Sequence, residues 1–449
     1  MTDIAASEAA GRPPTIGQRL LSPIAEVRRD EVMSVMLMTL LMLLILGAYY
    51  ELKTAREVFI LSEGGAEVKS YSSAGQAVLL LFLVPAYGAF ASRVNRVQLV
   101  QWVTAFFVLH IGIFLLALRS GFHIGVAYFL WVGIFNLMVI AQFWAFAADL
   151  YTPEQGKRLF PIIGIGASLG AWLGSVRAGD LMARAGPTRL LAGGAVILLG
   201  CVLLARIVNH VTPKKEVAAA SSPEAPLGGK GGFSLVFGDR YLFLIAMLMV
   251  VLNVVNTTGE YLFGRYVVQA AIAMHGADPS AAAARETFIG TTYSSLFSTV
   301  NLVGFVLQMF VVSRLFKFLG VGKSLFVHPS VAMAGYVMMA VMPSLSAMRW
   351  LKVADNSLDY SLGNTSKQAL WLPTSRDAKY KAKQAVDSFF VRMGDVLQAA
   401  LVFTGEQLAL SVAAFARINI VLAGVWLGIV VLLNRQLRAK AAQTGRSEL

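Results

Sequence analysis

The sequence predicts an all-α polytopic membrane protein in which twelve transmembrane helices form two pseudo-symmetric six-helix bundles. Of its 449 residues, 57% are hydrophobic and only 14% are charged, whereas soluble domains carry about 25% charged residues. The apolar runs are about 20 residues or longer, a length that spans a bilayer as a helix rather than as a barrel strand. A stretch rich in Pro, Gly and Ala at 212–232 divides the runs into two groups of six, as a flexible linker would.

Each predicted span is an apolar run bounded by polar or glycine-rich residues. The twelve runs cover 32–61, 74–92, 97–118, 124–150, 159–183, 189–209, 241–271, 288–314, 322–342, 346–371, 384–406 and 412–434.

The runs imply five regions of the chain. We expect a cytoplasmic segment at 1–30, a first bundle at 31–211, a linker at 212–232, a second bundle at 233–435 and a cytoplasmic tail at 436–449. The first run is long and no small-residue cleavage site follows it, so we interpret it as a retained helix and not as a signal peptide.

Charge predicts the orientation of the helices. The net charge is +13, and basic residues gather in alternate connecting segments. The segments predicted to lie outside carry only Lys69, Arg119, Arg184, Arg189 and Arg285. Because cytoplasmic loops are enriched in Lys and Arg, both termini are expected to be cytoplasmic, in the inner (plasma) membrane of a bacterium. The excess charge suits contact with anionic lipids and not a nucleic-acid interface.

Residue types that serve metals, cofactors or catalysis are sparse. Cys201 is the single cysteine, and the five histidines are scattered along the chain. No arrangement of a nucleophile with a base stands out, and no glycine-rich phosphate loop is present. We therefore expect no enzyme, metal or cofactor here.

Charged residues near the end of the first span are candidate site residues. Tyr49, Lys53, Arg56 and Glu57 fall on one helical face. A charge inside a bilayer costs about 2.5–3.5 kcal/mol on insertion scales, so such residues usually have a function. The face therefore predicts a cavity-lining role; the alternative is a helix end at the interface with snorkelling side chains.

The tenth span carries a polar stripe at three- and four-residue spacing. It consists of Lys352, Asp355, Asn356, Asp359, Gly363, Ser366 and Lys367. Such a stripe on an apolar helix predicts the wall of an aqueous cavity, unless the segment is a short surface helix. Lys352 and Asp355 are close enough along the helix for their charges to interact.

Other spans add polar positions to this pattern. Asn253, Asn256 and Glu260 share a face of the seventh span, so Glu260 is a candidate ion-pair partner for a basic residue of the first half. The eleventh span carries Arg392, Asp395 and Gln398 on one face. Together they suggest a polar path between the halves. By contrast, Gly166, Gly170 and Gly174 of the fifth span predict close helix packing and not a substrate contact.

The loop after the second span is similar to a known family motif. Gly88-Ala-Phe-Ala-Ser-Arg-Val-Asn-Arg96 resembles the Gly-x-x-x-Asp-Arg-x-Gly-Arg loop of the major facilitator superfamily. The segment 313–317 repeats its basic character after the second span of the second half. The resemblance implies the major-facilitator fold.

A more specific resemblance covers both halves. The segments 360–362, 367–373 and 379–387 are similar to the Tyr-Ser-Leu, Lys-Glu … Pro and Lys-x-Lys-Gly-Lys-Ala-Ala-Ile-Asp signature of the ATP/ADP (NTP/NDP) exchange translocases of plastids and bacteria. In the first half, 143–164 and 52–57 resemble two further blocks of that family. The family has acids where this chain has Gln368 and Gln155, and a Gly-Lys-Ser-Gly run near Asp395.

The resemblance implies a membrane transporter that moves a nucleotide by alternating access. Arg56 and Lys383 would then be cations facing phosphates, and Glu260 a charge partner near the family's acidic site. The expected partners are a small anionic substrate and membrane lipids. The alternatives are a transporter of the same fold with another cargo (a lipid, a peptide or a drug) and a non-transporting membrane sensor.

Overall fold

The computed structural model describes residues 26–91, 96–211 and 231–443, together with Gln18 and Gly229, and these residues form helices without strands. The first half contains α3 (Val32–Ala91), α4 (Arg96–Arg119), α5 (Gly125–Leu150), α6 (Pro153–Ala185) and α7 (Pro187–Val211). The second half contains α8 (Gly232–Gly238), α9 (Arg240–His275), α10 (Ala282–Val306), α11 (Val312–Ser324), α12 (Val327–Val341), α13 (Leu345–Leu358), α14 (Asn364–Ala369), α15 (Lys383–Ala385), α16 (Val391–Gln407) and α17 (Val412–Gln443). The second half also contains a 3₁₀ turn, η1 (Pro279–Ala281), and four π-helical segments, η2 (Leu307–Val311), η3 (Asp359–Gly363), η4 (Ala378–Ala382) and η5 (Val386–Phe390).

The predicted spans coincide with these helices, with differences at their ends. Most of the predicted linker, most of the segment 1–30, residues 92–95 of the loop motif and residues 444–449 lie outside the described residues. The last helix continues past the predicted bundle end at 435, to Gln443.

The first two predicted spans are the two limbs of α3. They meet at Gly65, whose φ of +73° lies in the left-handed region that favours glycine. The chain therefore reverses with almost no loop, and residues 66–91 return as a helix. The expectation that Lys69 lies in an outer loop was wrong: Lys69 is in the returning limb, only 8% exposed. A reversal at a single glycine leaves no surface loop for it.

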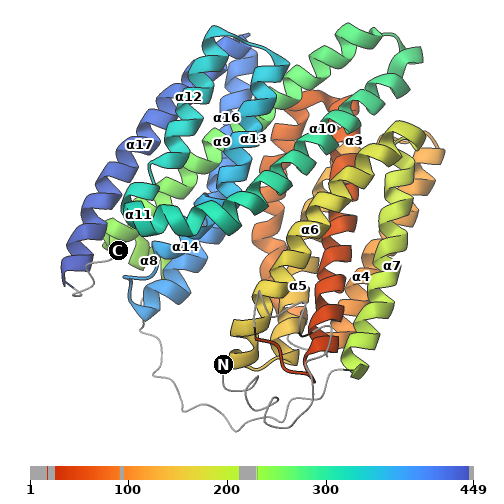
Figure 1. The fold of residues 1–449 in the computed structure, drawn as a ribbon. Helices are drawn as coiled ribbons and strands as arrows, with labels where there is room; N and C mark the ends of the chain where they lie inside the picture. The colour runs from red at the N-terminus through yellow and green to blue at the C-terminus, as the bar shows by residue number, and fades with distance from the viewer. Residues whose placement is uncertain (1–17, 19–25, 92–95, 212–228, 230, 444–449) are drawn as a thin grey trace.

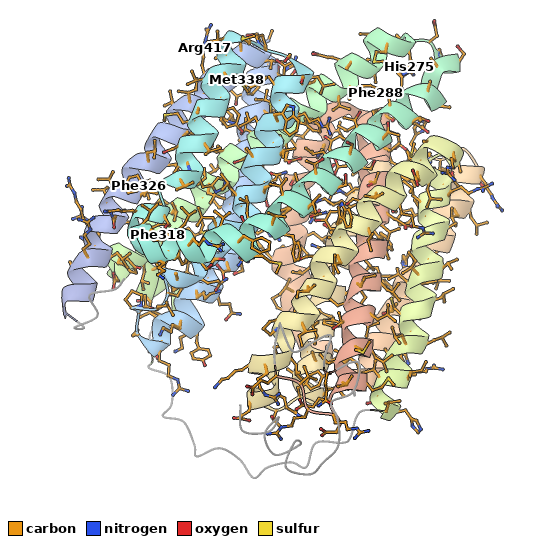
Figure 2. The ribbon with its side chains drawn as sticks, viewed as in Figure 1. His275, Phe288, Phe318, Phe326, Met338 and Arg417 are labelled. Carbon is orange, nitrogen blue, oxygen red and sulfur yellow. The ribbon has the colours of Figure 1, made fainter. Side chains whose placement is uncertain are left out.

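Eight helical stretches among the described residues are long and apolar enough to cross a membrane. Two of the predicted spans share one of these stretches, Val32–Tyr87. The predicted spans at 322–342, 346–371 and 384–406 fall short of that standard, because α12 has only 15 residues and because charged residues and π-helical turns interrupt the other two. Large apolar side chains such as Phe318 and Met338 are exposed, as a lipid-facing surface requires (Figure 2).

The two halves lie side by side and meet mainly at one end. In Figure 1 the helices of 32–211 and those of 240–443 are close at the upper end and farther apart at the lower end. α10 crosses between them and packs against α6 and α3. There the side-chain amide of Asn301 donates to the Ala171 carbonyl of α6 at 3.2 Å and accepts from the Tyr50 hydroxyl of α3 at 2.9 Å. These polar contacts fix the crossing point.

The start of α6 is held by a capping box. Thr152 accepts from the Gln155 N–H, and the Gln155 side chain accepts from the Thr152 N–H at 2.9 Å. Gln155 also donates to Glu31, which pairs with Arg158 at 2.8 Å. Burial would raise the pKa of Glu31, but hydrogen bonds from Arg158, the Arg28 N–H and Gln155 outweigh it and hold that pKa below its usual value. Gln155 thus ties α6 to the start of α3.

Glycines of α6 allow close contact with α3, as the sequence predicted. A Cβ on Gly170 would lie 2.2 Å from the Leu43 carbonyl oxygen, and one on Gly174 2.5 Å from the Gly47 oxygen. A Cβ on Gly166 would lie 2.5 Å from the Thr39 oxygen. Because each neighbour is backbone, it cannot move aside cheaply. The prediction of close packing is confirmed.

Gly170→Ala is therefore expected to destabilise the protein by about 1–3 kcal/mol, the usual cost of overpacking a tight contact. The measurement is the apparent melting temperature of the purified protein in detergent. Gly164→Ala is the matched control, because a Cβ there meets nothing within 4 Å. Equal melting temperatures for the two variants would contradict the packing role.

Candidate functional site

A charged cavity of about 220 Å³ lies where α3 meets the second half. Its lining comes from both limbs of α3 and from helices of the second half. From the first half it takes Lys53, Arg56, Glu57, Lys69, Ser70, Ser73, Gln76 and Phe129. From the second half it takes Asn256, Thr257, Glu260, Tyr261, Phe297, Asn356, Tyr360 and Gln398. The cavity is thus shared between the two halves of the chain.

The first limb of α3 brings two cations to the cavity in different states. Arg56 forms an ion pair with Glu57 at 2.5 Å and lies 4.7 Å from the centre of the Phe129 ring. Lys53 has no ion-pair partner among the described residues. Its ammonium lies 4.2 Å from the centre of the Phe297 ring and 5.1 Å from that of Tyr50. Aromatic faces attract a cation without neutralising it. Lys53 therefore keeps a positive charge available to a ligand.

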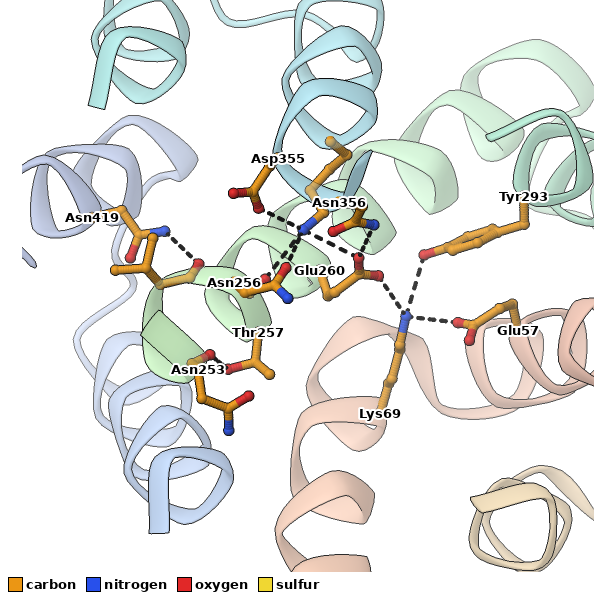
Figure 3. A network of polar contacts seen from close by, with 12 residues as sticks. Glu57, Lys69, Asn253, Asn256, Thr257, Glu260, Tyr293, Asp355, Asn356 and Asn419 are labelled. Atoms are coloured by element: carbon orange, nitrogen blue, oxygen red, sulfur yellow. Dashed lines mark hydrogen bonds and ion pairs between the residues drawn. The ribbon is translucent and has the colours of Figure 1, made fainter. Parts of the chain in front are cut away.

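Lys69 joins the two halves. Its ammonium lies 2.6 Å from a carboxylate oxygen of Glu57 on the other limb of α3, and 3.6 Å from one of Glu260 on α9 (Figure 3). The hydroxyl of Tyr293 on α10 is 3.5 Å away. This confirms the prediction that Glu260 pairs with a basic residue of the first half.

Lys352 continues the ion pairs into the second half. It is fully buried, and its ammonium lies 3.2 Å from Glu260 and 3.2 Å from Asp355. The side-chain oxygen of Asn256 accepts from it at 2.6 Å. A buried ammonium is tolerated only with such partners. Asn356 adds a hydrogen bond to Glu260 at 3.2 Å. The predicted coupling of Lys352 to Asp355 is confirmed, and the two form the wall behind Glu260.

Several predicted site residues lie away from the cavity, each with a partner of its own. Lys367 pairs with Asp359 at 3.0 Å and Arg392 with Asp395 at 3.3 Å. Lys383, expected to face phosphates, pairs with Asp387 at 2.5 Å. None of these side chains lines the cavity in this conformation.

Sequence reasoning missed several cavity residues, among them Lys69 and Tyr261, and it did not foresee the contact that Gln398 makes. Lys69 was assigned to a loop, although the serines around it could have revealed a polar helical face. Tyr261 hydrogen-bonds to Glu406, and no pattern in the seventh span marked it. Gln398 was placed on a polar face, but its bond to Ser70 of the other half, at 3.2 Å, follows only from the packing of α16 on α3.

The lining charges leave one positive charge in excess. Among the lining residues, the two cations Arg56 and Lys69 are balanced by the two carboxylates Glu57 and Glu260. In the wall behind Glu260, Lys352 is balanced by Asp355. Lys53 is the remaining cation among the described lining residues. The cavity can therefore bind an anionic group without opening an existing ion pair.

No family model matches this sequence, and no curated protein matches it. Solved structures do match. A bacterial homolog of the human lysosomal transporter Spinster, inward-facing and unoccupied, has a TM-score of 0.60 and 13% identity over 92% of this chain and 99% of its own. A bacterial homologue of the iron transporter ferroportin, also inward-facing, has a TM-score of 0.63 and 12% identity over 90% of this chain and 99% of its own. The nucleoside transporter NupG has a TM-score of 0.60 and 12% identity over 90% and 99%. The chain therefore has the major-facilitator fold of a polytopic membrane protein.

The ion pairs around Lys352 predict a non-additive stability effect. Lys352→Gln leaves Glu260 and Asp355 without their shared cation and should cost about 3–5 kcal/mol. Adding Asp355→Asn removes one orphaned charge, so the double variant should be more stable than Lys352→Gln alone. Apparent melting temperatures of both single variants and the double variant complete the cycle. Simple additivity of the two effects would show that the residues do not interact.

Proposed function

We propose that the chain is a transporter that moves a compact organic anion by alternating access. The observation that carries this proposal is the free charge of Lys53 in a cavity shared by both halves. Residues 31–211 and 233–435 would move as two bodies around the cavity. The fold supports the proposal, because each of the three matched structures is described as a transporter or a homologue of one.

The cavity favours a cargo with one anionic group and a flat ring. Lys53 supplies one unmatched positive charge, while Arg56 and Lys69 are already paired with carboxylates. Phe129, Phe297 and Tyr360 supply aromatic surfaces in the same lining. Lys53 lies over Phe297 and Arg56 over Phe129, whereas no cation among the described residues lies over Tyr360, so a flat ring can stack on Tyr360 while its anionic group meets Lys53. The volume of about 220 Å³ is below the usual range of ligand pockets, about 300–1,000 Å³, which favours a compact molecule.

A nucleotide is the specific cargo that the family resemblance suggests. A base offers a ring for the aromatic faces, and a phosphate offers an anion for Lys53. The charge balance ranks nucleotides by phosphate number. A triphosphate would have to open the pairs of Arg56 and Lys69 to gain more cations, whereas a monophosphate, with a charge of about −1.5 to −2 at neutral pH, exceeds the single charge of Lys53 by no more than about one. We therefore place a nucleoside monophosphate ahead of ATP within this class.

We also propose an orientation. The lower end in Figure 1, where the halves are farther apart, would face the cytoplasm of a bacterium and carry both termini. The charge distribution of the sequence supports this assignment. Two of the matched structures are inward-facing, which supports the same state here.

Lys53→Gln is expected to abolish stabilisation by anionic cargo. In a thermal-shift screen of detergent-purified protein, a saturating anion should stabilise the natural chain by about 2–4 kcal/mol. The screen should include adenosine, AMP, ATP and aromatic carboxylates. Lys317→Gln is the matched control, because Lys317 is exposed and outside the cavity.

The expected result is a shift with a singly phosphorylated or carboxylated ring compound that disappears in Lys53→Gln and persists in Lys317→Gln. A shift that survives in Lys53→Gln would refute the role of Lys53. A response to lipids or to uncharged adenosine alone would favour another cargo on the same fold.

A further inference from the structure

A line of ion pairs runs from the cavity into the second half, and its last member is a buried histidine. His328, near the start of α12, is 5% exposed, and its Nε2 lies 2.9 Å from Asp355 Oδ1. The other carboxylate oxygen of Asp355 pairs with Lys352. The imidazole also packs edge-on against the Trp426 ring of α17, with 4.8 Å between ring centroids.

The second ring nitrogen of His328 has an unusual environment. Nδ1 is buried and has no hydrogen-bond partner among the described residues. It faces the π-helical segment η3 across Gly363: a Cβ on that glycine would lie 3.3 Å from Nδ1. The same Cβ position is 3.2 Å from Asp359 Oδ1 and 3.2 Å from the Leu358 carbonyl oxygen. The Gly363 backbone thus lies against a buried ring nitrogen that has no hydrogen-bond partner among the described residues.

This arrangement differs from that of a structural histidine, whose two nitrogens are both satisfied in a folded core. With Nε2–H donating to Asp355, the neutral ring keeps a lone pair on Nδ1. A proton from water can add to that lone pair without breaking any bond. The imidazolium then keeps its Nε2–H bond to the Asp355 carboxylate, which becomes an ion pair. The neighbouring segment η3 is a π-helical turn, and such turns are frequent at functional sites.

Charge balance adds a second argument. With His328 neutral, the line of ion pairs contains the cations Arg56, Lys69 and Lys352 and the anions Glu57, Glu260 and Asp355, and is electrically balanced. One proton on His328 makes it positive. That charge competes with Lys352 for Asp355 and leaves Lys352 free to bind Glu260 more closely. Glu260 is the residue that Lys69 uses to hold the two halves together.

We propose that His328 and Asp355 form a proton-binding site that is joined to the cavity wall through Lys352. The ligand of the site is a proton, and its natural role is that of the coupling ion for movement of the two halves. The charged and titratable groups that face the site come from four elements: Asp355 and Lys352 of α13, Glu260 of α9, Asp359 of η3 and Tyr336 of α12.

The contact with Trp426 gives a direct test that needs no cargo. A protonated imidazole quenches the fluorescence of an indole ring in contact with it. The full-length protein in detergent is taken from pH 8 to pH 5.5 while its tryptophan emission is recorded. The natural chain is expected to lose up to about a seventh of its emission, the share of one tryptophan among seven.

Three variants should lack this loss. His328→Gln removes the proton acceptor, Trp426→Phe removes the reporter, and Gly363→Ala fills the space beside Nδ1. His123→Gln should retain it, because His123 is exposed and distant in sequence from the site. If His328→Gln fails to fold, the other two variants carry the test. A loss of equal size in Trp426→Phe or His328→Gln, or no loss in the natural chain, would overturn the proposal. Because no transport is measured, this result is independent of the cargo.

Discussion

The bridge that Lys69 forms between Glu57 and Glu260 is the interaction on which the rest of the site depends. It can exist only because α3 reverses at Gly65, which brings both limbs of one helix to the same cavity. Each carboxylate in the bridge has a second cation, Arg56 or Lys352. The charges therefore remain buried at a tolerable cost, and the two halves stay in contact where these residues meet. Because neighbouring pairs share a charged residue, breaking one pair changes the charge balance of the next.

The same constraint limits what the cavity can bind. Most cations that the sequence offers for phosphates are already matched by carboxylates, so the number of cations does not measure the capacity for anions. What matters is the surplus, and among the described lining residues it rests on Lys53. The aromatic rings around Lys53 leave its charge unmatched and would supply surfaces for the proposed flat cargo. A neutral line of ion pairs beside one unmatched cation suits the proposed carrier role, in which the cargo would have to be released as well as bound.

Much of this fold could be predicted from the sequence, because hydrophobic runs and basic loops report directly on bilayer crossing. The packing stripe of Gly166, Gly170 and Gly174 was also readable, since small residues at four-residue spacing serve few other purposes. Only some of the individual ion pairs could be predicted from the sequence. Lys352 with Asp355 is local in sequence, whereas Lys69 with Glu57 required knowing that Gly65 reverses the chain. No sequence pattern marked His328, because its partners Asp355 and Trp426 come from α13 and α17, which only the folded chain brings together.

The central claim, that the Lys69 bridge holds the halves in this arrangement, can be tested by distances between spin labels. Labels are placed at the exposed positions Lys157→Cys and Lys379→Cys in a Cys201→Ala background. We predict one long-distance population in the natural chain and a second, shorter one in Lys69→Gln, because halves released from the bridge can rock and close the wider end. Lys317→Gln should leave the distribution unchanged. Identical distributions in Lys69→Gln and the natural chain would contradict the account.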